Sequence, residues 1–170
     1  MPDDAPLPFD PIEEARRQWV RHGWRAAAPG MSAVTSVVRV DQLLIARAEA
    51  ALRPFELSFA RYEVLMLLSF SRTGALPLGK IGARLQVHPA SVTNAIDRLE
   101  SQGFVRRRLN PADGRGKLAQ ISPRGRKVAM RATSTLNDSV FSTLGLSRTE
   151  CAELFELLRK VRLAAHDFVG

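Results

Sequence analysis

Residues 78–122 constrain the fold more than any other part of the chain, because they hold two short amphipathic segments followed by two extended ones. Within each amphipathic segment the apolar residues recur three or four positions apart, namely Ile81 and Leu85, then Val92, Ile96 and Leu99. This spacing places the apolar side chains on one face of a helix. The sequence therefore predicts two short helices joined by a tight turn.

The residues at both ends of the second segment are also typical of helix ends. His88 stands at the N-cap and Pro89 at the first helical position, where a missing N–H costs nothing. Gly103 suits a left-handed residue at the helix end. A helix-turn-helix of this length can lay its second helix in the major groove of DNA, and it can also serve as a protein-docking module.

A basic hairpin is predicted directly after these helices. Residues 104–109 and 117–122 read as extended segments, and the Asn110-Pro111 and Asp113-Gly114 pairs between them form turns. The predicted fold is therefore mainly α, a winged helix-turn-helix with a small β-hairpin wing. Helices before and after it are expected to form a dimer.

Charge is concentrated in this same part of the chain. Residues 78–131 contain twelve Lys and Arg residues against three acids, a net charge of +9, whereas the whole chain of 170 residues carries +8. Such localisation is typical of a surface that meets phosphates, and it favours double-stranded DNA as the partner.

The DNA-facing residues of the second helix are those that point away from its apolar stripe. Asn94 can bond an adenine edge, Ala90 can touch a thymine methyl, and hydroxyls can reach a base or a phosphate. The alternative is that the hydroxyls only satisfy the first helical turn and that Asn94 is solvated. The predicted set is His88, Ala90, Ser91, Thr93, Asn94 and Arg98.

The wing supplies the remaining predicted DNA contacts. Arg115, between two glycines at the tip, suits a narrow minor groove. Arg106, Arg108 and Lys117 are expected to anchor phosphates. Arg107 lies on the other face of the strand, so if that face is buried its guanidinium needs an anion. That anion is either an acidic ligand or a protein carboxylate from Glu63 or Asp97.

The flanking segments are predicted to be helical over residues 11–25, 32–53, 58–74 and 123–144, with a last helix from Ser147, and residues 26–30 are predicted to be a break. The domains expected are an N-terminal extension helix (1–30), a dimerisation region (31–57 and 123–170) and the winged helix-turn-helix (58–122). The last helix carries a long apolar stripe, which either packs in the core or pairs across a twofold axis. Its residues include Leu154, Leu157, Leu158 and Val161.

The sequence from residue 57 to 125 resembles the MarR family of transcriptional regulators. Its wing reads Asn110-Pro-Ala-Asp-Gly-Arg115, where the family has Asp-Pro-x-Asp-x-Arg. The resemblance implies a homodimeric regulator, generally a repressor, that leaves a palindromic operator when a small-molecule effector binds. It also implies a pair between Arg115 and Asp97.

An added helix at the N-terminus resembles the urate-responsive branch of that family. That branch implies a ligand site built from Trp19, Glu63 and Arg107, but Ala95 stands where the branch has a second arginine. Without that arginine the effector is expected to be an anionic or aromatic molecule other than urate. Trp19 is otherwise a core anchor for the added helix. The alternative function is an architectural or constitutive DNA-binding protein without an effector.

Other kinds of chemistry find no support in the sequence. The three histidines and one cysteine lack metal-ligand spacing, and no nucleophile arrangement is recognisable, so neither a metal, a cofactor nor an enzyme is expected. No apolar run approaches the ~18 residues of a membrane span. A lone cysteine and an acidic N-terminus that does not read as a secretory signal indicate a cytoplasmic protein.

Overall fold

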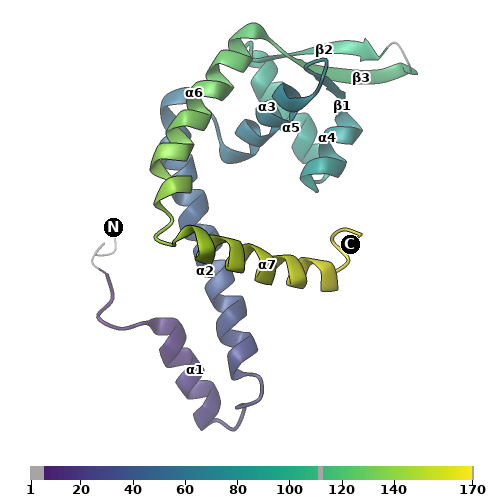
Figure 1. Ribbon diagram of the computed structural model, residues 1–170. Coiled ribbons are helices and arrows are strands. Elements are labelled where there is room, and N and C mark those ends of the chain that lie inside the picture. Colours follow the sequence, from purple (N-terminus) through teal and green to yellow (C-terminus); the bar gives the residue numbers. More distant parts are fainter. Residues whose placement is uncertain (1–5, 111–112, 170) are drawn as a thin grey trace. The chain divides into compact units, whose positions relative to one another are not determined.

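A computed structural model describes residues 6–110 and 113–169, without the side chains of residues 113–115. The chain divides into two compact units, residues 1–50 and residues 51–170. Helices make up most of both units, and the strands belong to the second (Figure 1).

The first unit contains α1 (Pro11–Arg21) and most of α2 (Ala28–Leu52). Asp10 caps α1 by accepting the backbone N–H of Ile12 at 2.8 Å, as a short acidic side chain at an N-cap does. α1 ends four residues earlier than predicted, before Gly23 with its φ of 88°. The break predicted at 26–30 is wrong in part, because Pro29 lies in the first turn of α2, where proline is tolerated.

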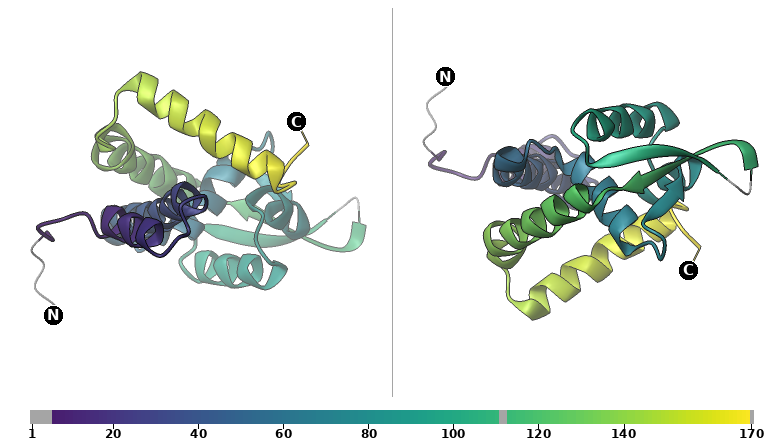
Figure 2. Two further views of the ribbon diagram at one scale, coloured as in Figure 1. Left: turned by 90° about the horizontal axis from the view of Figure 1, so that it is seen from below. Right: turned by 90° about the horizontal axis from the view of Figure 1, so that it is seen from above.

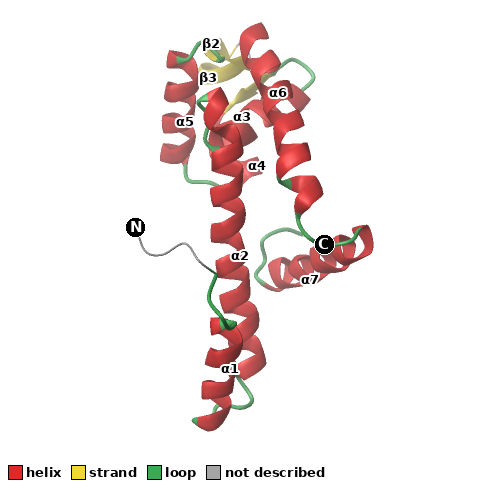
Figure 3. Ribbon diagram, turned by 90° about the vertical axis from the view of Figure 1, so that its left-hand side faces the viewer, coloured by secondary structure: helices red, strands yellow, loops and turns green. Residues whose placement is uncertain are grey.

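The second unit holds the remaining elements in the order typical of a winged helix-turn-helix. They are the 3-10 turn η1 (Arg53–Phe55), α3 (Phe59–Phe70), β1 (Ala75–Pro77), α4 (Leu78–Leu85), α5 (Pro89–Ser101), β2 (Val105–Asn110), β3 (Asp113–Ile121), α6 (Pro123–Ser139), the 3-10 turn η2 (Phe141–Thr143) and α7 (Arg148–Ala164). The strands form one antiparallel sheet in the order β1-β3-β2. Figure 3 shows this sheet beside α3, α4, α5 and α6.

The core of the second unit lies where α3, α4 and α5 meet the inner face of the sheet. Its fully buried side chains include Leu65, Leu68, Ile81, Ile96, Leu99 and Val105. The apolar residues predicted for α4 and α5 therefore serve as the contact faces of these helices, as their spacing required. Gly82 lets α4 approach α5, since a Cβ there would come within 3.3 Å of both the Val87 carbonyl and the Val92 side chain.

The second strand of the wing is longer than the sequence suggested. β3 begins at Asp113 rather than at 117, and the two strands extend beyond the helices of this unit (Figure 2). β1 was not predicted, because its three residues carry no periodicity of their own and depend on pairing with β3. α6 ends at Ser139, five residues earlier than predicted, where η2 turns the chain toward α7.

Candidate nucleic-acid interface

The helix α5 presents one polar face to solvent while its opposite face is anchored in the core. Val92, Ile96 and Leu99 are buried, so the helix cannot rotate about its axis without exposing them. The predicted contact residues of this face are all exposed, four in the first two turns and Arg98 in the third: Ala90, Ser91, Thr93, Asn94 and Arg98. This is the arrangement that a helix needs to read base edges in a groove.

Two of the predicted contact residues already take part in the local structure of α5. The Nδ1 atom of the His88 ring accepts the backbone N–H of Ala90 at 3.2 Å, which makes His88 the N-cap. The hydroxyl of Thr93 donates to the carbonyl of Pro89 at 3.1 Å. Among the described residues, none forms a hydrogen bond or an ion pair with the side chain of Ser91 or Asn94. These two side chains can therefore form hydrogen bonds with another molecule.

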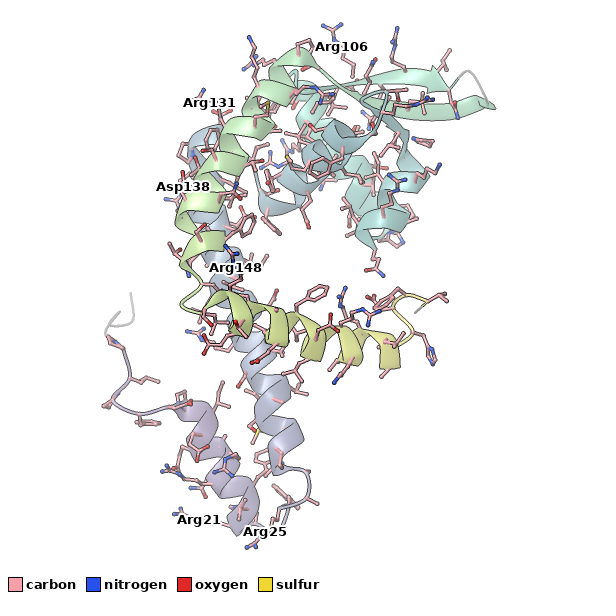
Figure 4. All side chains as sticks on the ribbon, in the orientation of Figure 1. Arg21, Arg25, Arg106, Arg131, Asp138 and Arg148 are labelled. Atoms are coloured by element: carbon pink, nitrogen blue, oxygen red, sulfur yellow. The ribbon has the colours of Figure 1, made fainter. Side chains whose placement is uncertain are left out.

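The strand β2 places two cations on the outer face of the sheet. Arg106 and Arg108 are exposed and alternate with the half-buried Arg107 along β2, and Arg106 projects away from the sheet (Figure 4). Arg108 donates to the side-chain oxygen of Gln120 on β3 at 3.0 Å. Lys117 is exposed on β3 and pairs with Leu109, so it lies on the opposite face of the wing, with Arg107. The side chain of Arg115 lies outside the described residues.

Arg107 joins the wing to α5 through two carboxylates. Its Nη2 lies 2.6 Å from Asp97 and its Nη1 lies 2.5 Å from Glu100, and its backbone N–H donates to Glu100 at 2.8 Å. These backbone and side-chain hydrogen bonds from Arg107 hold the pKa of Glu100 below its usual value. The guanidinium that needed an anion therefore has protein partners, and Asp97 is one of the two that the sequence offered.

Glu100 was not anticipated as a partner, although a signal was present. Asp97 and Glu100 are three positions apart, so they share a face of α5 and can both bind one guanidinium group. Along β2, Val105 is fully buried and Leu109 is 75% exposed, because the strand leaves the core as it runs outward. Arg107 lies between these two, where a buried charge requires a partner.

The other predicted ligand residues are half-buried. Burial raises the pKa of Glu63 on α3, and this carboxylate is not among the partners of Arg107 in the described part of the chain. Trp19 packs edge-on against Trp24, with ring centroids 5.2 Å apart. Trp19 belongs to the first unit and Glu63 to the second, so the ligand site that would join them stays a prediction.

Two further properties concern the described residues as a set. They contain no group of three or more His, Cys, Asp or Glu side chains that could hold a metal ion. No helix formed by these residues is long and apolar enough to cross a membrane.

Known proteins match this chain closely. Residues 57–117 match the MarR family. Sco5413, a MarR family transcriptional regulator from Streptomyces coelicolor, is 46% identical over 84% of this chain and 99% of its own, with a TM-score of 0.76. A mutant MarR from E. coli in complex with operator DNA is 26% identical over 75% and 91% of the two chains, with a TM-score of 0.69.

A curated relative gives the same result over a shorter length. The uncharacterized HTH-type transcriptional regulator YhbI of Bacillus subtilis is 30% identical over 84 residues, which are 49% of this chain and 53% of that protein. This chain thus spans about half the length of that relative. The winged fold, the wing after α5 and the match to Sco5413 over nearly all of its length agree, and the chain belongs to the MarR family of transcriptional regulators.

Proposed function

We propose that the protein is a homodimeric transcriptional regulator that binds double-stranded DNA in a sequence-specific manner. The observation that carries the proposal is the exposed polar face of α5 beside the arginine-rich strand β2. The E. coli MarR with a similar fold was crystallised with operator DNA, which supports the same use of this surface here. Residues 58–122 would form the DNA-binding domain.

Each group of residues has a distinct role in this proposal. Asn94, Ser91 and Ala90 read base edges in the major groove, where each base pair presents its own pattern of donors and acceptors. Thr93 and His88 hold the first turn and reach the adjoining phosphates. The cations position the duplex without reading its sequence, namely Arg98, Arg106, Arg108 and Lys117, with Arg115 in the minor groove.

A twofold dimer accounts for the apolar surface outside the winged helix. α7 exposes Phe155, Leu157 and Val161, and no residue of this helix is buried. α2 likewise exposes large apolar side chains along much of its length: Val34, Val37, Val38, Val40, Leu43 and Ile45. Such surface favours association through residues 31–57 and 123–170. Two recognition helices about 34 Å apart would then read an inverted repeat.

A small anionic or aromatic effector would release the protein from its operator, so the protein would act in the cytoplasm as a ligand-responsive repressor. The proposed ligand residues are Trp19, Glu63 and Arg107. Binding must favour a spacing of the two recognition helices that differs from the DNA-bound spacing, because a ligand shifts an equilibrium only through differential affinity.

A second candidate is a constitutive or architectural DNA-binding protein without an effector. Two observations favour it. Arg107 already pairs with Asp97 and Glu100, and Ala95 stands where the urate-responsive branch has the second arginine of its ligand site. In this case Trp19 would only complete the packing of α1 against Trp24.

The experiment that tests the proposal combines binding with a ligand panel. Fluorescence anisotropy on the promoter region beside the gene should give binding to an inverted repeat that is tighter than binding to unrelated duplex. A panel of aromatic and carboxylic metabolites is then screened by thermal shift and by DNA release. A compound that raises the melting temperature and releases DNA supports the regulator, whereas a protein that binds DNA and responds to none supports the second candidate.

A further inference from the structure

A groove of about 600 Å³ lies between the first turn of α3 and the helix α5. Ser58 and Arg61 line it from α3. Ser91, Asn94 and Arg98 line it from α5, where they follow one another at three- and four-residue spacing along a single flank of the helix. Ala60 and Ala95 complete the lining, while the other five side chains are polar and two of them are guanidinium groups.

The two arginines in this groove are not neutralised by the protein. No acidic residue lines the groove, and among the ion pairs of the described residues none includes Arg61 or Arg98. Arg61 donates from Nε to the Ser58 hydroxyl at 3.1 Å, which orients its guanidinium beside the helix end. Arg107 is a contrast on the other flank of α5, since two carboxylates satisfy it. The groove therefore carries a positive charge that an anion would complement.

The backbone at this end of α3 adds to the same field. α3 begins at Phe59, and the Ser58 side chain accepts the N–H of Arg61 at 3.3 Å. The first turn contains no acidic residue, so no carboxylate there offsets the positive end of the helix dipole.

We propose that this groove seats one phosphate of the operator backbone, so that α3 is a third DNA-contacting element beside α5 and the wing. The inference rests on the proposed function, because Ser91, Asn94 and Arg98 belong to the face that would meet the duplex. A duplex held by that face brings its backbone along the flank of α5, where the groove opens. Arg61 is the residue that this inference adds, and Ser58 orients it.

The test is a salt titration of duplex binding by Arg61→Ala, read by fluorescence anisotropy with the full-length protein. The slope of log Kd against log salt concentration should fall by about 0.9 for each protomer bound, as expected for one lost phosphate contact. Affinity should fall roughly ten-fold, and equally for the operator and for unrelated duplex, because a phosphate contact carries no sequence information. Arg61→Lys should restore most of the slope, since it restores the charge.

The matched control is Arg72→Ala, which removes the same charge from the opposite end of α3, where Arg72 is exposed. It should leave the slope unchanged, and thermal unfolding should confirm that every variant is folded. The inference is overturned if Arg61→Ala keeps the slope of the unmodified protein. It is also overturned if that variant keeps its DNA affinity but is no longer stabilised against thermal unfolding by added inorganic phosphate. That result would make the groove a site for a small anion. Failure of the unmodified protein to bind any duplex would instead remove the proposed function itself.

Discussion

At the scale of single residues, Arg107 determines how the wing is held against the recognition helix. Its guanidinium spans Asp97 and Glu100, which are one turn apart on α5, while its backbone belongs to β2. The Arg107 side chain is 21% exposed, but Asp97 is 57% and Glu100 38% exposed, so water still screens these pairs in part. The same contacts compensate the charge of Asp97, which would otherwise repel the phosphates of a duplex bound as we propose.

Arg107→Ala should lower the free energy of unfolding by about 1–2 kcal/mol at pH 7, because the ~1.5–3 kcal/mol of a hydrogen bond to a charged group is reduced by the exposure of both carboxylates. Because the pKa of Glu100 is lowered in the folded state, its contribution is fully present above the usual value of 4.5 and is lost as the pH falls through the folded value. The difference between the variant and the unmodified protein should shrink in acid. Urea unfolding at several pH values measures it.

The control for that experiment is Arg106→Ala, which removes the same charge from the exposed face of the same strand. Its stability should stay within about 0.5 kcal/mol of the unmodified protein, as is usual for a surface substitution. Equal losses in both variants would mean that the two carboxylates do not stabilise the fold through Arg107.

Glu63 gives a prediction of opposite sign. Burial raises its pKa, so the folded state disfavours the ionised carboxylate, which is the form of this group in the unfolded chain at pH 7. Glu63→Gln should raise the melting temperature at pH 7, and the gain should vanish below pH 4.5, where the carboxyl group is neutral in both states. A melting temperature that falls at pH 7 would show that the ionised form of Glu63 has a favourable partner.

At the scale of elements, α6 is locked against the start of the wing. A Cβ on Gly125 would lie 2.2 Å from the carbonyl oxygen of Phe104 and 2.9 Å from its carbonyl carbon. That carbonyl also accepts the backbone N–H of Ser122 at 2.9 Å, and the hydroxyl of Ser122 caps α6 through the N–H of Gly125. Neither backbone can move without breaking these hydrogen bonds.

Gly125→Ala should consequently destabilise the fold by about 1–3 kcal/mol or more, the cost of overpacking a rigid contact. Gly79→Ala is the matched control, because nothing lies within 4 Å of a Cβ at this position in α4. That change should be neutral or stabilising by up to about 1 kcal/mol, since alanine favours a helix over glycine. Denaturant unfolding measures both changes, and equal stability of the two variants would contradict this prediction.

Most elements of the second unit could be predicted because their signals are local. The caps at Ser58, His88 and Ser147 and the left-handed Gly103 lie where the sequence placed them. The misses are non-local: β1 exists through pairing with β3, and the early end of α6 depends on the turn before α7. In the site, alternation along β2 correctly separated Arg107 from its neighbours. Periodicity could not identify Glu100 as its partner, because that choice depends on how β2 crosses α5.

At the scale of the whole molecule, the proposed dimer would match two winged helices to one palindrome. The strongest support is the apolar surface of α7, which ends in a turn where Arg159 and Arg162 cover the Phe168 ring at 5.5 Å each. The capping box of Ser147 and Glu150 fixes the other end of this helix. α7 is thus well formed even though none of its residues is buried, as expected of a helix that packs against a second chain.

Leu157→Glu should convert the protein from dimer to monomer, because the charge would be buried in the proposed interface. Size-exclusion chromatography with light scattering gives the mass directly. Phe70→Glu is the control, since this exposed side chain on α3 lies outside the proposed dimerisation region. A dimer that survives Leu157→Glu would place the interface elsewhere.

The most direct measurement of the central claim is the affinity of the purified protein for duplex DNA as a function of salt. Binding should weaken steeply from 50 to 200 mM NaCl, because each dimer makes several phosphate contacts in the proposed complex. Asn94→Ala should reduce the preference for the operator by roughly 1–3 kcal/mol while leaving the salt dependence unchanged. Failure to bind duplex DNA at 50 mM salt, or binding with no dependence on salt, would contradict the proposed function.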